Sequence, residues 1–255
     1  MAMLRQKESF TTGRHVRLDV EMAQSPADVL ESQALRYDVF AREAGAQLHN
    51  TIEGIDHDRF DPHCRHLLVR DTDTGRVVAS TRILTCEEVR HTDGYYSATE
   101  FDLGAIRHLP GRVMEIGRTC VHADYRSGAA IAMLWKGISR FLTAQAYDHL
   151  IGCASICLGD GGIQAQAVMQ RLRQRHMLPE GQRVTPLLPF PPRPIDASLA
   201  PIMPPLLKAY LRVGAKIGGE PYWDRDFNVA DVFVLLDVSQ LDDRYARHFQ
   251  VKRKA

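Results

Sequence analysis

A strand, a loop of small residues and a helix follow one another directly in the middle of the chain. Residues 113–122, VMEIGRTCVH, predict a strand, and the loop DYRSGA comes next. From Ala130 the apolar residues recur at spacings of 3, 4 and 7, as in an amphipathic helix that faces a core. A helical crossover of this kind joins parallel strands. The unit therefore predicts an α/β layer.

The remaining pattern extends this layer into a mixed sheet with flanking helices. Residues 66–71 and 76–84 flank the turn Asp73-Thr74-Gly75, which is a hairpin signal and supplies an antiparallel pair. Further strands are predicted over 15–22, 150–158 and 229–238. Helices are predicted from Ser25-Pro26, an N-cap followed by proline, to about Ala44, and over 163–177 and 206–217.

Length and composition favour one domain. The 255 residues are 45% hydrophobic, enough for a sizeable core, and the net charge of +1 does not suggest a dedicated nucleic-acid binder. The Pro-rich stretch 186–205 is too short to separate two domains. We expect a flexible N-terminus over 1–14, one domain over 15–240 and a basic tail over 241–255.

The cysteines and the N-terminal segment predict a cytoplasmic protein. Five cysteines form no CxxC pair, and their odd number argues against a disulfide framework. The first 15 residues are polar, and no run of about 18 apolar residues occurs. Peripheral contact with a membrane stays open, because Arg171, Arg173, Arg175 and the terminal VKRKA could meet anionic lipid, an acidic protein partner or only solvent.

The loop before the central helix is a candidate phosphate site. Its small residues let backbone amides approach a phosphate, and the helix N-terminus adds a partial positive charge. It could hold the pyrophosphate of coenzyme A or the phosphopantetheine phosphate of acyl carrier protein, or be an ordinary connection. The candidate residues are Arg126, Ser127, Gly128, Ala129 and Ala130.

The strand before this loop carries Glu115 and Arg118. Three residues apart on a strand, they project to opposite faces and cannot line one site unless a bulge intervenes. A carboxylate here could act as the general base that an attacking amine needs. An ion pair or a solvated face is the alternative.

Two further places carry charge suited to a substrate. Asp56, Asp58 and Asp61 lie in an acidic, His-rich segment whose spacing matches no known metal site, so we predict no metal there. They could hold a cationic amino-acid side chain or form a polar loop. Arg82, in a strand of apolar and threonine residues, could clamp a substrate carboxylate or bridge to Glu115 or Asp102.

Several long strings resemble the ornithine N-acyltransferases of bacterial ornithine-lipid synthesis. The resemblance runs from about Arg36 to Leu236. Its carriers are RYDVF (36–40), FDPHCRHLLV (60–69), STRIL (80–84), YYSATEFDL (95–103), EIGRTCVHADYRSG (115–128) and GAKIGGEPYWDRDFNVADVFVLL (214–236). A weaker similarity to acyl-homoserine-lactone synthases rests on Arg36, Phe40, Arg82, Glu115 and Arg118.

The resemblance implies an N-acetyltransferase-like (GNAT) fold and a reaction. A 3-hydroxyacyl group passes from acyl carrier protein to the α-amine of L-ornithine, which gives lyso-ornithine lipid without a bound cofactor. The resemblance gives Glu115 the base role, Arg82 or Arg118 the task of fixing the substrate carboxylate, and Arg36 and Phe40 a place in the substrate site. Tyr125 departs from the Arg or Gln of general acetyltransferases at that position, which weakens the coenzyme A alternative.

Other functions stay open at this point. The acceptor could be another amino acid, or the enzyme could act like an acyl-homoserine-lactone synthase. An inactive module that binds carrier protein or a membrane is the non-enzyme alternative.

Overall fold

The computed structural model describes residues 16–49, 52–196 and 199–241. The predictions for residues 1–14 and for most of the tail 241–255 lie outside the described residues. No helix among the described residues is long and apolar enough to cross a membrane.

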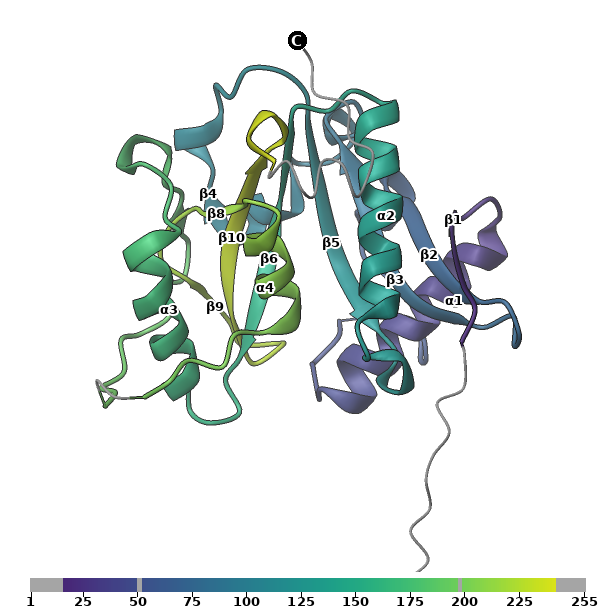
Figure 1. Cartoon of the computed structure of the whole chain (residues 1–255), viewed down its shortest axis with the longest axis horizontal. Helices are drawn as coiled ribbons and strands as arrows, with labels where there is room; N and C mark the ends of the chain where they lie inside the picture. Colours follow the sequence, from purple (N-terminus) through teal and green to yellow (C-terminus); the bar gives the residue numbers. More distant parts are fainter. Residues whose placement is uncertain (1–15, 50–51, 197–198, 242–255) are drawn as a thin grey trace, which may run out of the picture.

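One mixed sheet forms the centre of the molecule (Figure 1). Its path is β1-β2-β3-β5-β6-β10-β8, and β9 also pairs with β10. β5 and β6 run parallel, and the other adjacent strands in the sheet pair antiparallel. The mixed sheet is therefore confirmed. The strands are β1 Leu18–Met22, β2 Arg65–Asp71, β3 Val77–Thr85, β5 Val113–Val121, β6 His149–Cys157, β8 Lys216–Ile217, β9 Tyr222–Asp224 and β10 Val229–Asp237.

Helices cover both faces of the sheet. In Figure 1, α2, α3 and α4 lie in front of it and α1 lies behind. The Ser25 hydroxyl accepts a bond from the Asp28 N–H, and the Asp28 carboxylate accepts one from the Ser25 N–H, so the predicted cap of α1 is present. The helices are α1 Pro26–Tyr37, which continues as a π-helix Asp38–Glu43, α2 Ala129–Ala144, α3 Ile163–Arg175 and α4 Pro205–Arg212.

The predicted helix over 206–217 is wrong in its last part. α4 ends at Arg212, and Gly214 then adopts a φ of +100°, which turns the chain out of the helix. Lys216–Ile217 instead pairs with β10 as β8. The short pair β4 Phe101–Asp102 and β7 Thr185–Pro186 was not predicted either.

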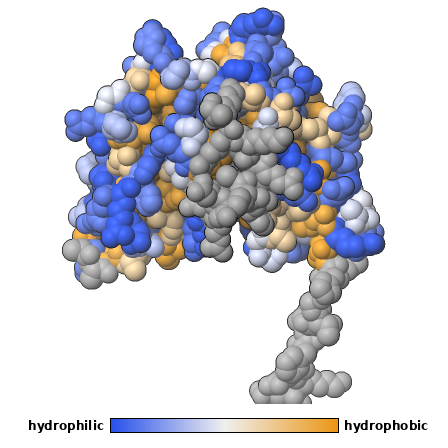
Figure 2. Space-filling model, turned by 45° about the horizontal axis from the view of Figure 1, so that its top comes forward, coloured by the Kyte–Doolittle hydropathy of each residue, from blue (hydrophilic) through white to orange (hydrophobic). Residues whose placement is uncertain are grey.

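Apolar side chains fill both layers. On the α2 face, Leu134 and Ile138 pack with strand residues such as Leu67 and Val234, and on the opposite face Phe101 packs with Phe233. On the face shown in Figure 2, hydrophilic residues cover most of the surface, with hydrophobic residues between them. The core therefore lies along the sheet, and burial of this area stabilises it.

The two parallel strands separate halfway along their length. β5 and β6 pair only from Val113–Ile116 to His149–Gly152. Beyond that point β5 continues beside β3, and β6 continues beside β10. A Cβ on Gly152 would lie 2.4 Å from the carbonyl oxygen of Ile116, so the last contact before the separation requires glycine.

We expect Gly152→Ala to destabilise the protein at this junction. The added methyl must push the backbones apart, and overpacking of this kind costs about 1–3 kcal/mol. The melting temperature should fall by roughly 2–10 °C. Gly181→Ala is the matched control, because a Cβ there meets nothing within 4 Å. Thermal unfolding followed by circular dichroism checks both, and equal melting temperatures would contradict the close approach.

Candidate active site at the gap between two central strands

A narrow cavity occupies the gap between β5 and β6. Its volume is about 80 Å³, and its walls include Gly117 and Thr119 from β5 and Cys153 from β6. Leu206 of α4 and Phe40 of the π-helix also line it. Because these two residues come from opposite faces of the sheet, the cavity reaches through the sheet. We call it the gap cavity.

A larger cavity adjoins the gap cavity on the α1 face. Its volume is about 570 Å³, and we call it the outer cavity. The two cavities share five lining residues, so a ligand in the outer cavity can reach the gap. The shared residues are Tyr96, Glu100, Arg118, Asp224 and Phe227.

Beside the cavities lies a buried set of ion pairs that we call the arginine–aspartate network. Arg36 of α1 is 1% exposed and donates from Nε to Asp56 at 2.7 Å. Its two Nη atoms donate to the two oxygens of Asp61 at 2.6 and 3.0 Å. Such bidentate pairs fix both partners. The members are Arg36, Arg82, Arg118, Asp56, Asp58 and Asp61.

The same network holds Arg82 of β3. Its Nη1 donates to Asp58 at 2.6 Å and to Asp61 at 3.3 Å. The predicted bridge from Arg82 to Glu115 or Asp102 is therefore corrected to Asp58 and Asp61. Burial alone would raise the pKa of Asp61, but the bonds and charge of Arg36 and Arg82 outweigh it and hold that pKa well below its usual range.

The structure also changes the assignment of the three aspartates. We predicted that Asp56, Asp58 and Asp61 hold a cationic substrate side chain. They pair instead with the chain's own guanidinium groups, because two buried carboxylates, Asp56 and Asp61, and the half-buried Asp58 require compensating charge. With three arginines and three aspartates, the network is neutral overall, and contact of these carboxylates with a substrate cation stays a prediction.

Arg118 reaches the network because a bulge interrupts β5. Ser80 pairs with Cys120 and Arg82 pairs with Gly117, so one residue of β3 faces two of β5. Arg118 takes a φ of +51°, a strained value for a residue with a side chain. The bulge brings Arg118 to the face that carries Glu115. The sequence analysis required a bulge for Glu115 and Arg118 to lie on one face, and this bulge is present.

Glu115 is occupied by neighbouring donors. It is 3% exposed and accepts bonds from the N–H groups of Tyr96 and Ser97, at 2.6 and 2.8 Å, and from the Ser97 hydroxyl. Burial raises its pKa, and these bonds oppose that rise. It lines neither cavity. Its role as general base stays a prediction, and the geometry favours a positioning role for the turn Tyr96–Thr99.

The predicted phosphate loop lies at the start of α2. Gly128 has a φ of +102° and begins the helix, and no side chain caps the first amides of α2. Arg126 pairs with Glu43 of the π-helix, with 2.8 Å from Nη2 to Oε2. Ser127, Ala129 and Ala130 belong to the same strand–loop–helix unit, which is confirmed.

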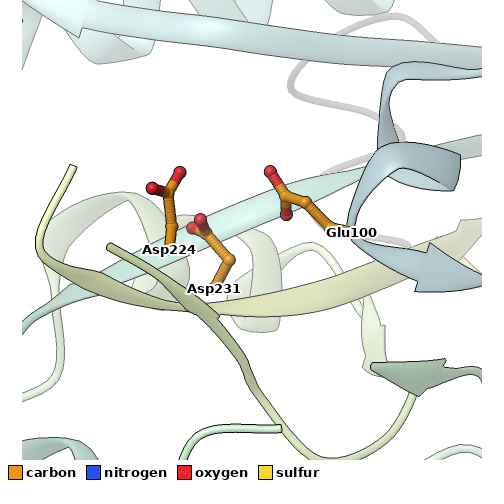
Figure 3. Close-up of side chains that lie close together, drawn as sticks. All are labelled: Glu100, Asp224 and Asp231. Atoms are coloured by element: carbon orange, nitrogen blue, oxygen red, sulfur yellow. The ribbon is translucent and has the colours of Figure 1, made fainter. Parts of the chain in front are cut away.

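Three carboxylates that the sequence analysis did not single out meet beside Arg118. They come from the end of the Tyr96–Thr99 turn, from β9 and from β10, and their oxygens lie within 4.8 Å of one another (Figure 3). We call Glu100, Asp224 and Asp231 the acidic trio. They lie in two of the strings that carry the family resemblance, 95–103 and 214–236, which was the available signal.

The acidic trio is unlike the network because its charge is poorly compensated. Burial raises the pKa of Glu100 well above its usual range, and Asp231 adds to the rise. Burial likewise raises the pKa of Asp231 to about 7, although the Ser155 hydroxyl donates to it at 2.6 Å. A cation placed here would stabilise the ionised carboxylates.

Comparison with known proteins supports the fold first. Residues 35–136 match the family model described as an acetyltransferase (GNAT) domain. A CoA-dependent acyl-homoserine lactone synthase, BjaI, solved with SAM and isopentyl-CoA, superposes with a TM-score of 0.58 at 16% identity, over 92% of this chain and 88% of that chain. FeeM, an N-acyl amino acid synthase from uncultured soil microbes, gives a TM-score of 0.53 at 10% identity, over 89% and 94%. These structures share the predicted GNAT fold.

Two curated relatives settle the family. A protein of Rhodobacter capsulatus named L-ornithine N(alpha)-acyltransferase is 33% identical, over 92% of this chain and 95% of the relative. One of Brucella abortus with the same name is also 33% identical, over 95% of this chain and 92% of the relative. This chain, with Arg118 in the wall of a gap in a GNAT sheet, therefore belongs to the L-ornithine N(alpha)-acyltransferase family.

Proposed function

We propose that this enzyme transfers an acyl group from a thioester to the α-amine of L-ornithine. The observation that carries the proposal is the gap cavity between β5 and β6, with Arg118 in its wall. A thioester entering between the strands meets an amino acid held in the outer cavity. The relatives' printed name supplies the acceptor and the type of reaction.

The donor enters along α2 and the separated strands. Beyond Ile116 the edge of β5 that faces β6 has no strand partner among the described residues, so its N–H groups can polarise the thioester carbonyl. The uncapped amides after Gly128 suit the phosphate of phosphopantetheine. We propose 3-hydroxyacyl-acyl carrier protein as the donor, with no bound cofactor. The basic residues Arg171 and Arg175 are a candidate contact for the carrier protein or for peripheral attachment to the inner membrane.

Arg118 is the best placed group for the acceptor's carboxylate. It lines both cavities, whereas Arg36 and Arg82 line neither. Its contacts to Asp56 and Asp58 are 3.4 and 3.5 Å, longer than the 2.6 Å contacts of the other two arginines. The Arg118 guanidinium can therefore donate hydrogen bonds to a ligand, because Asp56 and Asp58 remain paired with Arg36 and Arg82.

The chemistry is direct aminolysis. The α-amine nitrogen attacks the carbonyl carbon, the C–N bond forms, the C–S bond breaks, and the thiolate takes up a proton as the amine loses one. No covalent intermediate with the enzyme is required. Glu115 acts in this scheme by holding Tyr96 and Ser97, which place the Tyr96 ring 5.1 Å from the Arg118 guanidinium carbon.

Purified enzyme incubated with 3-hydroxyacyl-acyl carrier protein and L-ornithine should yield a 3-hydroxyacyl amide of ornithine. The α-amine should carry the acyl group, which fragmentation by mass spectrometry identifies. Acyl-coenzyme A is the parallel donor and should react more slowly, because Tyr125 replaces the Arg or Gln of coenzyme A-dependent relatives of this fold.

Absence of an ornithine amide with either donor would contradict the proposed function. Acylation of a different amino acid in a mixture would keep the acyltransferase activity and overturn the acceptor.

Replacement of Arg118 by Gln should raise the KM for ornithine by roughly 10- to 100-fold, because a charged hydrogen bond to the carboxylate is lost. The KM for the acyl donor should change less. Steady-state kinetics with each substrate varied in turn separates the two effects. Arg90→Gln, a change at a basic residue outside both cavities, is the control. An equal rise in KM for ornithine and for the acyl donor would instead indicate damage to the arginine–aspartate network.

A further inference from the structure

The carboxylates that line the two cavities fall into two groups. Asp56 and Asp58 pair with arginines of the network, and Asp226 pairs with His49 at 2.9 Å. Within the described part of the chain, no ion pair to a Lys, Arg or His side chain is formed by the acidic trio. Glu100, Asp224 and Asp231 are therefore the cavity carboxylates without such a partner; Glu100 and Asp224 line both cavities, and Asp231 lines the gap cavity.

One oxygen of the acidic trio is buried without a partner. Glu100 is 3% exposed, and among the residues that the structure describes its Oε2 has no hydrogen-bond donor. Figure 3 shows the Glu100 carboxylate pointing toward those of Asp224 and Asp231. Such an oxygen is costly unless a ligand supplies the donor. An ammonium group suits it, since it offers three N–H bonds and one positive charge to three converging carboxylates.

Arg118 and the acidic trio present opposite charges to one ligand. Arg118 and Glu100 line both cavities, and Cys153 and Ser155 also line the gap cavity. An amino acid with a cationic side chain can place its carboxylate on Arg118 and its distal ammonium in the acidic trio. Its α-amine then lies between these two contacts, over the gap where the thioester enters.

We propose that the acidic trio binds the side-chain ammonium of the acceptor and so makes the enzyme selective for a diamino acid. This rests on the proposed function, because it assigns the acceptor end of the same site. The selectivity comes from Glu100, Asp224 and Asp231, and acyl transfer itself depends on Arg118 and the strand gap.

The site should strengthen as the pH rises through about 7. Burial raises the pKa of Asp231 to about 7. The groups that interact with this carboxyl are Glu100, Asp224, Ser155, Arg118, Tyr96, Cys153 and Tyr222. At low pH the acidic trio holds protons that an ammonium must displace. Above about pH 7 the Asp231 carboxylate is ionised, and the ammonium binds to it without that cost.

The test compares ornithine with 2-aminopentanoate, which has the same carbon chain and no side-chain amine. The wild-type enzyme should acylate ornithine with a kcat/KM roughly 10- to 100-fold higher. This ratio should increase from pH 6 to pH 8. Well below the pKa of either α-amine, its deprotonated fraction rises about tenfold per pH unit in both substrates, so a change of the ratio with pH reports the side-chain contact.

Glu100→Gln and Asp231→Asn should reduce the ratio, because they lower activity on ornithine much more than activity on 2-aminopentanoate. Asp102→Asn, an exposed neighbour outside both cavities, should leave both activities and the ratio unchanged. Asp231→Asn should be no less stable than the wild type at pH 8, because a buried carboxyl with a raised pKa loses stability as the pH rises from about 4 to 7. Thermal unfolding checks that these variants fold.

Three results would overturn the proposal while acylation of ornithine still supports the proposed function. Equal kcat/KM of the wild-type enzyme for ornithine and 2-aminopentanoate would show that the acidic trio does not bind the side-chain ammonium. Equal loss on both substrates in Asp231→Asn would assign the carboxylate to the α-amine, as its proton acceptor. Activity that depends on added Mg²⁺, Ca²⁺ or Mn²⁺ and disappears with a chelator would assign the acidic trio to a metal ion.

Discussion

The bidentate pair between Arg36 and Asp61 is the contact on which the site depends. Arg36 comes from α1, and Asp61 begins a short helical turn just before β2. Asp61 also meets Arg82 of β3, so one buried carboxylate joins three segments that are far apart in the sequence. Removing one partner of a buried pair costs about 3–5 kcal/mol, because the other charge is left uncompensated. The wall beside the cavities is therefore rigid before any ligand arrives.

Because the arginine–aspartate network is neutral overall, the charged groups available to a substrate are Arg118 and the acidic trio. Arg118 is held loosely, at 3.4 Å from Asp56, so its positive charge can be shared with a ligand. The acidic trio lies outside the network, and no Lys, Arg or His side chain of the described residues forms an ion pair with it. Separation of β5 from β6 beyond Gly152 puts an opening between these two charged groups. Arg118 and the acidic trio can thus hold the amino acid beside the gap, and the gap can admit the acyl donor.

Local patterns predicted the elements of the fold well, because each is encoded by neighbouring residues. The spacing from Ala130 predicted α2, and the Asp73-Thr74-Gly75 turn predicted the hairpin of β2 and β3. The helix over 206–217 failed at its end because Gly214 reverses the chain and Ile217 finds a strand partner in β10. That pairing is a tertiary contact, and periodicity does not contain it.

The site was predicted less completely, because its partners are distant in the sequence. Because side chains alternate along a strand, the sequence indicated that Glu115 and Arg118 share a face only if a bulge lies between them. It did not show that the pairing of β5 with β3 contains such a bulge. Asp56, Asp58 and Asp61 looked free in the sequence, since the arginines that neutralise them lie 20 or more residues away. The acidic trio was missed for the same reason, because its three carboxylates come from separate segments.

A crystal structure with bound L-ornithine and a non-hydrolysable acyl-pantetheine thioether tests the central claim most directly. The acyl-bearing carbon should lie in the gap between β5 and β6, and the ornithine carboxylate should accept bonds from Arg118. Ornithine bound away from Arg118 would contradict the claim. So would an acyl group that lies outside the gap cavity and leaves the space between Gly117 of β5 and Cys153 of β6 empty.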